Sequence, residues 1–299
     1  MKKFILFALL ALLLPSSAWS YDVGEVFTAN IGTEESPYYM RFKRFGTDYD
    51  GTPLCVIYGE EGNPAIDPES AGQKGDGVLT ILGTVDNMII EDIGNYAFAE
   101  CHNITSVVIE SRQGKYASIT IGEYAFYNCT SLQQVSSNPF DLVSLSEHAF
   151  EGCSNLERYR CRSGSIPSYA FANCCSLKTI EDSHSNELYG IGECAFYNCS
   201  ALDWNFSLEE DGSVGNQAFY NCTSLTQVGN LGSVGEQAFY NCSSLAGQVR
   251  AITVGREAFA GTNISSITFY QTSGFYYEFD KTVSDYAFAY SEDANGRGN

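Results

Sequence analysis

Apolar residues recur at fixed offsets along most of this chain, with 20 to 29 residues between successive copies of the pair Ala-Phe. Five residues before each of these phenylalanines is an Ile, Leu or Val, and six residues after most of them is a Leu or Ile. The phenylalanines are Phe98, Phe126, Phe150, Phe171, Phe196, Phe219, Phe239, Phe259 and Phe288. A unit of this length cannot bury its own apolar face, so the units must stack around one continuous core.

Within each unit the pattern changes from turn residues to alternation. The segment Gly-x-x-Ala-Phe predicts a short helical turn, the next residues a tight bend, and the residues after the Leu a strand. In the first full unit, Ile104, Val107 and Ile109 are expected to point inward. Ser106 and Val108 alternate with them and are expected to point outward. The predicted fold is a solenoid of short parallel strands and short helical turns.

A cysteine follows most of the phenylalanines by three residues, and the last two units have Thr262 and Ser291 there instead. The cysteines are Cys101, Cys129, Cys153, Cys174, Cys199, Cys222 and Cys242. A small, weakly hydrogen-bonding side chain suits a tight bend, which favours a packing role. The alternative is a disulfide framework, which the parallel direction of stacked side chains disfavours. Four cysteines outside this series, Cys55, Cys161, Cys175 and Cys194, leave room for a pair.

The pattern I-G-E-Y-A-F-Y-N-C-T-S-L-Q-Q-V at Ile121–Val135 resembles the BspA-like, treponemal-type leucine-rich repeat, and the resemblance covers about residues 91–290. It implies a leucine-rich repeat solenoid in a right-handed arc with a concave parallel sheet. It also implies an exported bacterial surface or secreted protein that binds matrix proteins, host cells or other microbes. The family has no shared catalytic residues that could be assigned here.

The two ends of the chain differ from the array. Residues 1–20 have two lysines, an apolar run and then small residues, which predicts a secretory signal cleaved after Ser20. Residues 21–90 lack the repeat and contain strand patterns in Gly46–Gly59 and Gly77–Gly83, which predicts a small β-rich N-terminal cap. Residues 91–299 form the array of about eight full repeats and a partial ninth. No C-terminal cap follows, so that end either offers an uncapped surface for self-association or continues in a longer protein.

Charge limits the classes of partner. The chain has 36 acidic and 16 basic residues and a formal net charge of −20. A field of this sign disfavours nucleic acid and anionic lipid surfaces. No second long apolar run follows the predicted signal, so no integral membrane segment is expected after its removal.

Catalytic and metal motifs are not found. The three histidines, His102, His148 and His184, have no local nucleophile motif, and neither C-x-x-C nor H-E-x-x-H occurs. Asp48–Gly51 is similar to the start of a calcium loop, but Gly59 occupies the position of the last ligand, so we interpret it as a turn. The sequence predicts no enzyme, no cofactor and no metal.

The candidate site is the strand L-E-R-Y-R-C-R at 156–162. With Tyr159 inward, Arg158, Arg160 and Arg162 project from the concave face of an acidic protein. Guanidinium groups suit carboxylate, sulfate or phosphate. Neighbouring strands add Gln134, Thr179 and Glu181 to the candidate ligand-binding residues. The alternative is that the arginines only balance adjacent acids such as Glu181 and Asp182.

Aromatic residues add two open questions. In D-W-N-F-S-L at 203–208, one register points Trp204 and Phe206 outward as a binding platform, so Trp204 is a candidate site residue. A slip of one residue buries both with Leu208, and this register is favoured because it removes more apolar surface from water. The tyrosines that follow Phe in adjacent units, Tyr197, Tyr220 and Tyr240, are expected to stack and stiffen the array rather than to bind ligand.

The sequence therefore predicts a secreted or cell-surface, non-enzymatic binding protein. Its expected partner is an extracellular protein, a matrix component or a cell surface, recognised in the manner of an adhesin through the concave sheet. The alternatives are a structural or self-associating surface component, or a binder of anionic glycans.

Overall fold

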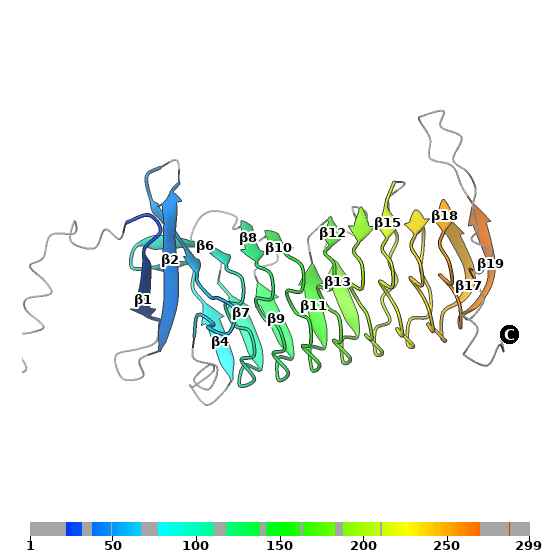
Figure 1. Ribbon diagram of the computed structural model, residues 1–299, viewed down its shortest axis with the longest axis horizontal. Coiled ribbons are helices and arrows are strands. Elements are labelled where there is room, and N and C mark those ends of the chain that lie inside the picture. The colour runs from blue at the N-terminus through cyan, green and yellow to red at the C-terminus, as the bar shows by residue number, and fades with distance from the viewer. Residues whose placement is uncertain are drawn as a thin grey trace, which may run out of the picture.

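The computed structural model describes residues 22–31, 38–48, 50–66, 77–110, 118–137, 142–161, 164–182, 188–209, 211–269 and 287. The repeat units are coils stacked side by side in an elongated row, with β1 and β2 at one end and β17 and β19 at the other (Figure 1). The predicted leucine-rich repeat solenoid is confirmed. The predicted signal at 1–20 and the C-terminal end with its ninth unit, apart from residue 287, lie outside the described residues.

Four strands that each follow a repeat Ile or Leu form a five-stranded parallel sheet with β4 (Val78–Ile81), here called the main sheet. Its order is β13 (Thr179–Asp182), β11 (Arg158–Cys161), β9 (Gln134–Ser137), β7 (Ser106–Ile109) and β4. The strand predicted in every unit is absent after Leu202 and Leu225. The inward positions Ile104, Val107 and Ile109 are buried as predicted. Ser106 is buried as well, against the prediction, because Gln134 of the next coil covers it and donates from Nε2 to Ser106 Oγ at 3.3 Å.

A second sheet, of two-residue strands, runs along the row near the glycines of Gly-x-x-Ala-Phe. It contains β12 (Ser165–Ile166), β14 (Gly190–Ile191), β15 (Ser213–Val214), β16 (Ser233–Val234) and β18 (Thr253–Val254), all parallel. The sequence pattern marked its buried Ile and Val positions but not its strands. At the C-terminal end of the described row, β17 (Ala246–Ala251) pairs in parallel with β19 (Asn263–Phe269).

The N-terminal sheet combines antiparallel and parallel pairing. Its strands are β1 (Val26–Asn30), β2 (Tyr39–Thr47), β3 (Pro53–Ile57), β5 (Thr84–Val85), β6 (Met88–Ile93), β8 (Ser118–Ile121) and β10 (Leu142–Leu145). The hairpin of β1 and β2 precedes β3, which is antiparallel to β2 but parallel to β6. Both strand patterns predicted in residues 21–90 are present as β3 and β4, and β4 already pairs with β7 of the array.

The segments predicted as short helical turns are not helices, and the described residues contain no helix of any length. Along 122–129 the amides alternate in direction. Those of Ala125, Tyr127 and Cys129 bond to carbonyls three residues back, whereas those of Tyr124, Phe126 and Asn128 bond to carbonyls of the next coil. A helix would need both sets within its own unit. Because every second amide donates to the next coil, the segment forms successive turns rather than a helix.

Two positions in each coil that the structure describes between residues 94 and 261 have the left-handed backbone conformation, which supports these turns. One precedes Ala-Phe, as at Tyr124 with φ of 55°, and the other precedes the Cys, as at Asn128 with φ of 56°. Each is the third residue of a four-residue turn, the position at which type II turns need a positive φ. The second position is Asn or Gly in most coils, the residues that adopt this conformation most readily.

Coil spacing also explains the recurring glycine. A Cβ added to Gly122 would lie 2.6 Å from Asn95 Oδ1, and one added to Gly192 would lie 2.4 Å from the backbone nitrogen of Ser168. Both contacts are to the preceding coil, so glycine is needed because neighbouring backbones approach closely.

The phenylalanines form the centre of the core. The eight from Phe98 to Phe259 are at most 1% exposed, and successive rings stack with centroids 5.1–5.6 Å apart. Each stacked pair is worth about 0.5–1.5 kcal/mol beyond the area that it buries. The core therefore runs through the row without interruption.

Candidate binding face

The candidate arginines project from a strand that is fixed by its inward side chain. Tyr159 is 2% exposed and packs against the rings of Phe150 and Phe171, with centroids 5.2 and 5.1 Å away. Because neighbours along a strand point to opposite faces, Arg158 and Arg160 point outward, as predicted. Their side chains are 61% and 41% exposed.

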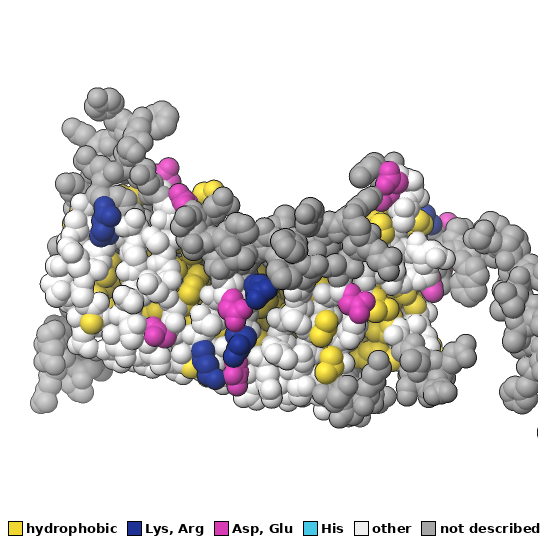
Figure 2. All heavy atoms as spheres, turned by 180° about the vertical axis from the view of Figure 1, so that it is seen from behind, with side chains coloured by type: hydrophobic (Ala, Val, Ile, Leu, Met, Phe, Trp, Pro, Cys, Tyr) yellow, Lys and Arg dark blue, Asp and Glu magenta, His cyan; other side chains and the backbone are white. Residues whose placement is uncertain are grey.

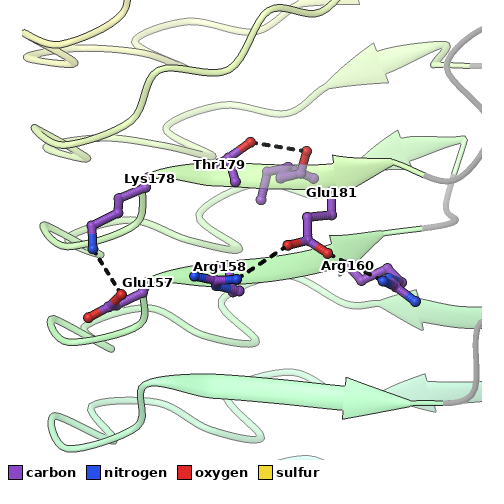
Figure 3. A network of polar contacts seen from close by, with 7 residues as sticks. Glu157, Arg158, Arg160, Lys178, Thr179 and Glu181 are labelled. Carbon is purple, nitrogen blue, oxygen red and sulfur yellow. Dashed lines mark hydrogen bonds and ion pairs between the residues drawn. The ribbon is translucent and has the colours of Figure 1, made fainter.

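Both arginines share one carboxylate. Glu181 of β13 lies opposite Arg160 in the parallel pairing. Its Oε1 is 3.9 Å from Arg158 Nη1, and its Oε2 is 3.4 Å from Arg160 Nη2 (Figure 3). The predicted balance between the arginines and Glu181 is therefore present. One carboxylate neutralises only one of the two guanidinium charges. Exposed ion pairs of this kind are also weak enough for a ligand to compete with them.

A second ion pair, which sequence reasoning missed, lies beside the first. Lys178 Nζ donates to Glu157 Oε2 at 2.9 Å (Figure 3), and this hydrogen bond lowers the pKa of the Glu157 carboxyl. Both residues directly follow a repeat leucine, so they occupy the same place in neighbouring coils. That shared offset was the available signal.

The other predicted site residues have different fates. Gln134 is exposed and lies opposite Arg158 across β9 and β11. Thr179 is half-buried beside Arg158, and its hydroxyl donates to the Ile180 carbonyl at 3.5 Å. Arg162 lies outside the described residues. The structure thus brings five of the predicted polar residues onto one face: Arg158, Arg160, Gln134, Thr179 and Glu181.

Trp204 does not belong to this face, which corrects its place among the candidate ligand-binding residues. Trp204, Phe206 and Leu208 are 7%, 5% and 4% exposed, so the favoured register is the correct one. The Trp204 ring packs against Phe196 and Phe206 with centroids 5.6 and 4.8 Å away. Burying three large apolar side chains outweighs continuing the register of the preceding strands.

Charge is concentrated in the middle of the face. Figure 2 shows basic and acidic side chains gathered there, with mostly uncharged atoms on either side. The group comprises Arg158, Arg160, Lys178, Glu157 and Glu181. These ion pairs set three cations against two carboxylates on a chain with a net charge of −20, and Asp203 lies beside Lys178 in the next coil.

The repeated cysteines link neighbouring coils through their thiols. From Cys129 to Cys242, each Sγ lies 3.0–3.2 Å from the carbonyl oxygen of the Phe in the preceding coil, to which it donates. Burial raises the pKa of these thiols. Thr262 differs, since its hydroxyl donates to Phe259 of its own coil at 2.7 Å. The predicted packing role of the cysteines is therefore confirmed.

Cysteines outside this series form no disulfide among the described side chains. Cys55 and Cys194 are buried thiols, and Cys175 is exposed. Burial raises the pKa of Cys55 to about 12. The side chain of Cys161 lies outside the described part of the chain.

Aromatic rings stack along the turn edge of the row. Tyr197, Tyr220 and Tyr240 stack as predicted, with centroids 5.0 and 4.8 Å apart. In earlier coils His148 stacks between Tyr124 and Tyr169, at 4.4 and 4.6 Å, and its Nδ1 is 2.6 Å from Glu151 Oε2. Because neighbouring rings cover one another's faces, these ladders stiffen the stack.

Comparison with known proteins agrees with the geometry. The family described as BspA type Leucine rich repeat region matches residues 91–226 and 164–295, with six copies. This chain belongs to that family. No curated protein matches the sequence of this BspA-type protein.

Several solved structures are similar to this BspA-type protein. The T. pallidum leucine-rich repeat protein is 20% identical with a TM-score of 0.42, over 74% of this chain and 86% of that one. A leucine-rich cell surface protein from Faecalibacterium prausnitzii A2-165 is 18% identical with a TM-score of 0.46, over 83% and 77%. A leucine-rich repeat protein from Bacteroides ovatus ATCC 8483 is 18% identical with a TM-score of 0.30, over 77% and 75%.

Family membership suggests a role in protein interaction. Within the described ranges, no group of three or more His, Cys, Asp or Glu residues is placed to hold a metal ion. The same ranges include no apolar helix long enough to cross a membrane.

Proposed function

We propose that this BspA-type protein is exported and binds an extracellular protein, a matrix component or a cell surface through the exposed face of the main sheet. The observation that carries the proposal is the pair Arg158 and Arg160, held outward on one strand by the packing of Tyr159. No catalytic step is part of it.

The arrangement supports anion recognition. Two guanidinium groups at alternate positions of a fixed strand leave only their side chains to be ordered when a ligand binds, and guanidinium forks match carboxylate and sulfate groups. Glu181 occupies both in the free protein, so a ligand carboxylate or sulfate would displace or join it. An acidic segment of a matrix protein and a sulfated glycan both offer this chemistry.

The decisive test is binding of the purified chain to matrix proteins and sulfated glycans, compared with Arg158→Glu and with Arg158→Glu/Arg160→Glu. We expect at least about tenfold weaker binding for the double variant, because each reversed charge loses a charge-assisted hydrogen bond. Arg250→Glu is the matched control, since Arg250 is also an exposed arginine, on β17.

A second variant sharpens the test. Glu181→Gln keeps the size of the side chain and removes the competing charge, so anion binding should strengthen. If the double arginine variant and Glu181→Gln both bind every probe as the unaltered chain does, the main sheet is not the binding surface.

A further inference from the structure

The hairpin at the N-terminal end has a surface unlike the rest of this acidic chain. Strands β1, β2 and β3 contain no Asp or Glu, whereas β2 alone carries Arg41, Lys43 and Arg44. Exposed apolar side chains gather here too. Of the five large ones found among the described residues, four belong to residues 23–45: Val23, Val26, Tyr39 and Phe45.

Two of these apolar side chains, Tyr39 and Phe45, lie on β2 together with Arg41 and Lys43. Tyr39, Arg41 and Lys43 alternate with the buried Met40 and Phe42, so they share the solvent face. Phe45 is the extra residue of a bulge in the pairing with β3 and is 44% exposed, while Tyr39 is 59% exposed. We call Tyr39, Arg41, Lys43 and Phe45 the β2 row. At about 3.4 Å per residue, it is roughly 20 Å long.

Tyr58, which directly follows β3, supports the two cations from the side. Lys43 Nζ is 5.0 Å and Arg41 Cζ is 5.9 Å from its ring centroid. Arg41 is also held by the backbone, since its Nη2 donates to the carbonyls of Asn63 and Pro64. Lys43 forms no ion pair with a carboxylate of the described residues. Its charge therefore lies over the Tyr58 ring, whose hydroxyl donates to the Glu60 carboxylate.

We propose that the β2 row is a second binding surface and that it takes an anionic polysaccharide, one whose sugar units bear carboxylate or sulfate groups. The cations match the charged groups, and this charge complementarity selects an anionic partner although the chain as a whole is acidic. The rings at the two ends match the sugars, because the apolar C–H face of a sugar ring packs on the negative face of an aromatic ring.

The length of the row selects a polymer rather than a single sugar. Its four side chains are spread along one extended strand, so a ligand must extend over several units to reach both rings and both cations. An acidic polypeptide would satisfy the cations but would have no need of the exposed rings, which separates the two occupants experimentally.

The test uses the full chain with four probes: heparin, polygalacturonate, poly-glutamate and neutral dextran. Lys43→Glu and Tyr39→Ala are each expected to weaken binding to both anionic polysaccharides by about tenfold or more. Tyr39→Phe keeps the ring and should bind as the unaltered chain does. Arg250→Glu makes the same charge change on β17, at the other end of the described row, and should leave binding unchanged. Rising salt should weaken binding, and dextran should not bind.

Three results would overturn the proposal. The first is unchanged binding of both anionic polysaccharides by Lys43→Glu and Tyr39→Ala with thermal unfolding unaltered. The second is loss of all polymer binding in Arg158→Glu/Arg160→Glu alone, which would assign the activity to the main sheet. The third is binding to poly-glutamate as tight as to heparin, with no effect of Tyr39→Ala, which would make the partner an acidic protein. Loss in the β2 variants alone supports this inference even if the main sheet proves inactive.

Discussion

Two parts of the row, separated by the coil of Leu177, share the repeat leucine but bury opposite sets of the residues that follow it. After Leu156 the third residue, Tyr159, points inward, and the arginines on either side are exposed. After Leu202 the second residue, Trp204, points inward and alternates with Phe206. The first segment forms β11 in the main sheet, whereas no strand is formed at 203–209.

The difference shows that the repeat determines where a strand can start but not its register. Both segments keep Phe, Cys and Leu in the core, so the coils stack in either case. The register then follows the apolar residues within each segment, since a shift of one residue exchanges the two faces. A charged face forms only where the polar residues occupy the alternate positions.

The largest expected effect concerns the thiols that both parts share. Burial raises the pKa of Cys129, Cys174 and Cys222 well above 9.0, so the folded state keeps them protonated. Stability is then fully present below pH 9 and is lost as the pH rises above it, because only the unfolded thiols ionise. The loss is about 1.4 kcal/mol per thiol for each pH unit.

Denaturant unfolding at pH 8 and pH 10, with reductant present, measures this loss. Cys174→Ser should reduce the pH dependence of the unfolding free energy by an amount equal to about one proton. Cys175→Ser, which changes an exposed thiol, is the control. Equal denaturant midpoints at pH 8 and pH 10 would contradict the inference that the buried thiols stay protonated in the folded state.

The next largest effect on stability is expected for Trp204→Ala, which changes only the segment after Leu202. Removing a large buried aromatic side chain should cost about 3–5 kcal/mol of unfolding free energy. Asn205→Ala changes its exposed neighbour and should stay within about 0.5 kcal/mol. The two denaturant midpoints decide the register: similar shifts would mean that Trp204 is not in the core.

A smaller effect is expected at a ladder of asparagines. Asn221 Nδ2 donates to Asn198 at 2.9 Å, and its Oδ1 accepts from Asn241 at 2.8 Å, with φ of 61° at Asn221. Asn221→Ala should cost about 1–3 kcal/mol through the lost hydrogen bonds and the left-handed backbone. Asn221→Gly loses the same hydrogen bonds, but glycine adopts the left-handed conformation without strain. Its thermal unfolding midpoint should therefore lie between those of the unaltered chain and Asn221→Ala. An alanine variant as stable as the unaltered chain would refute the ladder.

The smallest effect on stability is expected for Arg158→Glu/Arg160→Glu. The pairs with Glu181 are exposed, so the change should cost at most about 1 kcal/mol per arginine. Circular dichroism during heating checks this, with Tyr159→Ala as the contrasting buried change. A large loss for the arginine variant would show that the charged group stabilises the coils rather than awaiting a ligand.

Sequence reasoning was accurate where one apolar residue per unit decides the outcome. The Phe core and the outward arginines follow from spacing. The strand predicted after the Leu forms in some units but not after Leu202 or Leu225. It was less successful at Ser106, which is covered by Gln134 from 28 residues further on. It also kept Trp204 among the site residues although its own preferred register buried that side chain.

The sequence by itself determined that the units stack, which residues enter the core and which strand offers its arginines, because these depend on periodicity alone. Only the tertiary structure decided that the turns are not helical, since every second amide is used by the next coil. It also decided that one carboxylate, Glu181, serves two arginines and that the thiols bond to Phe carbonyls of the preceding coil. Contacts between coils involve residues far apart in the chain, and no local pattern specifies them.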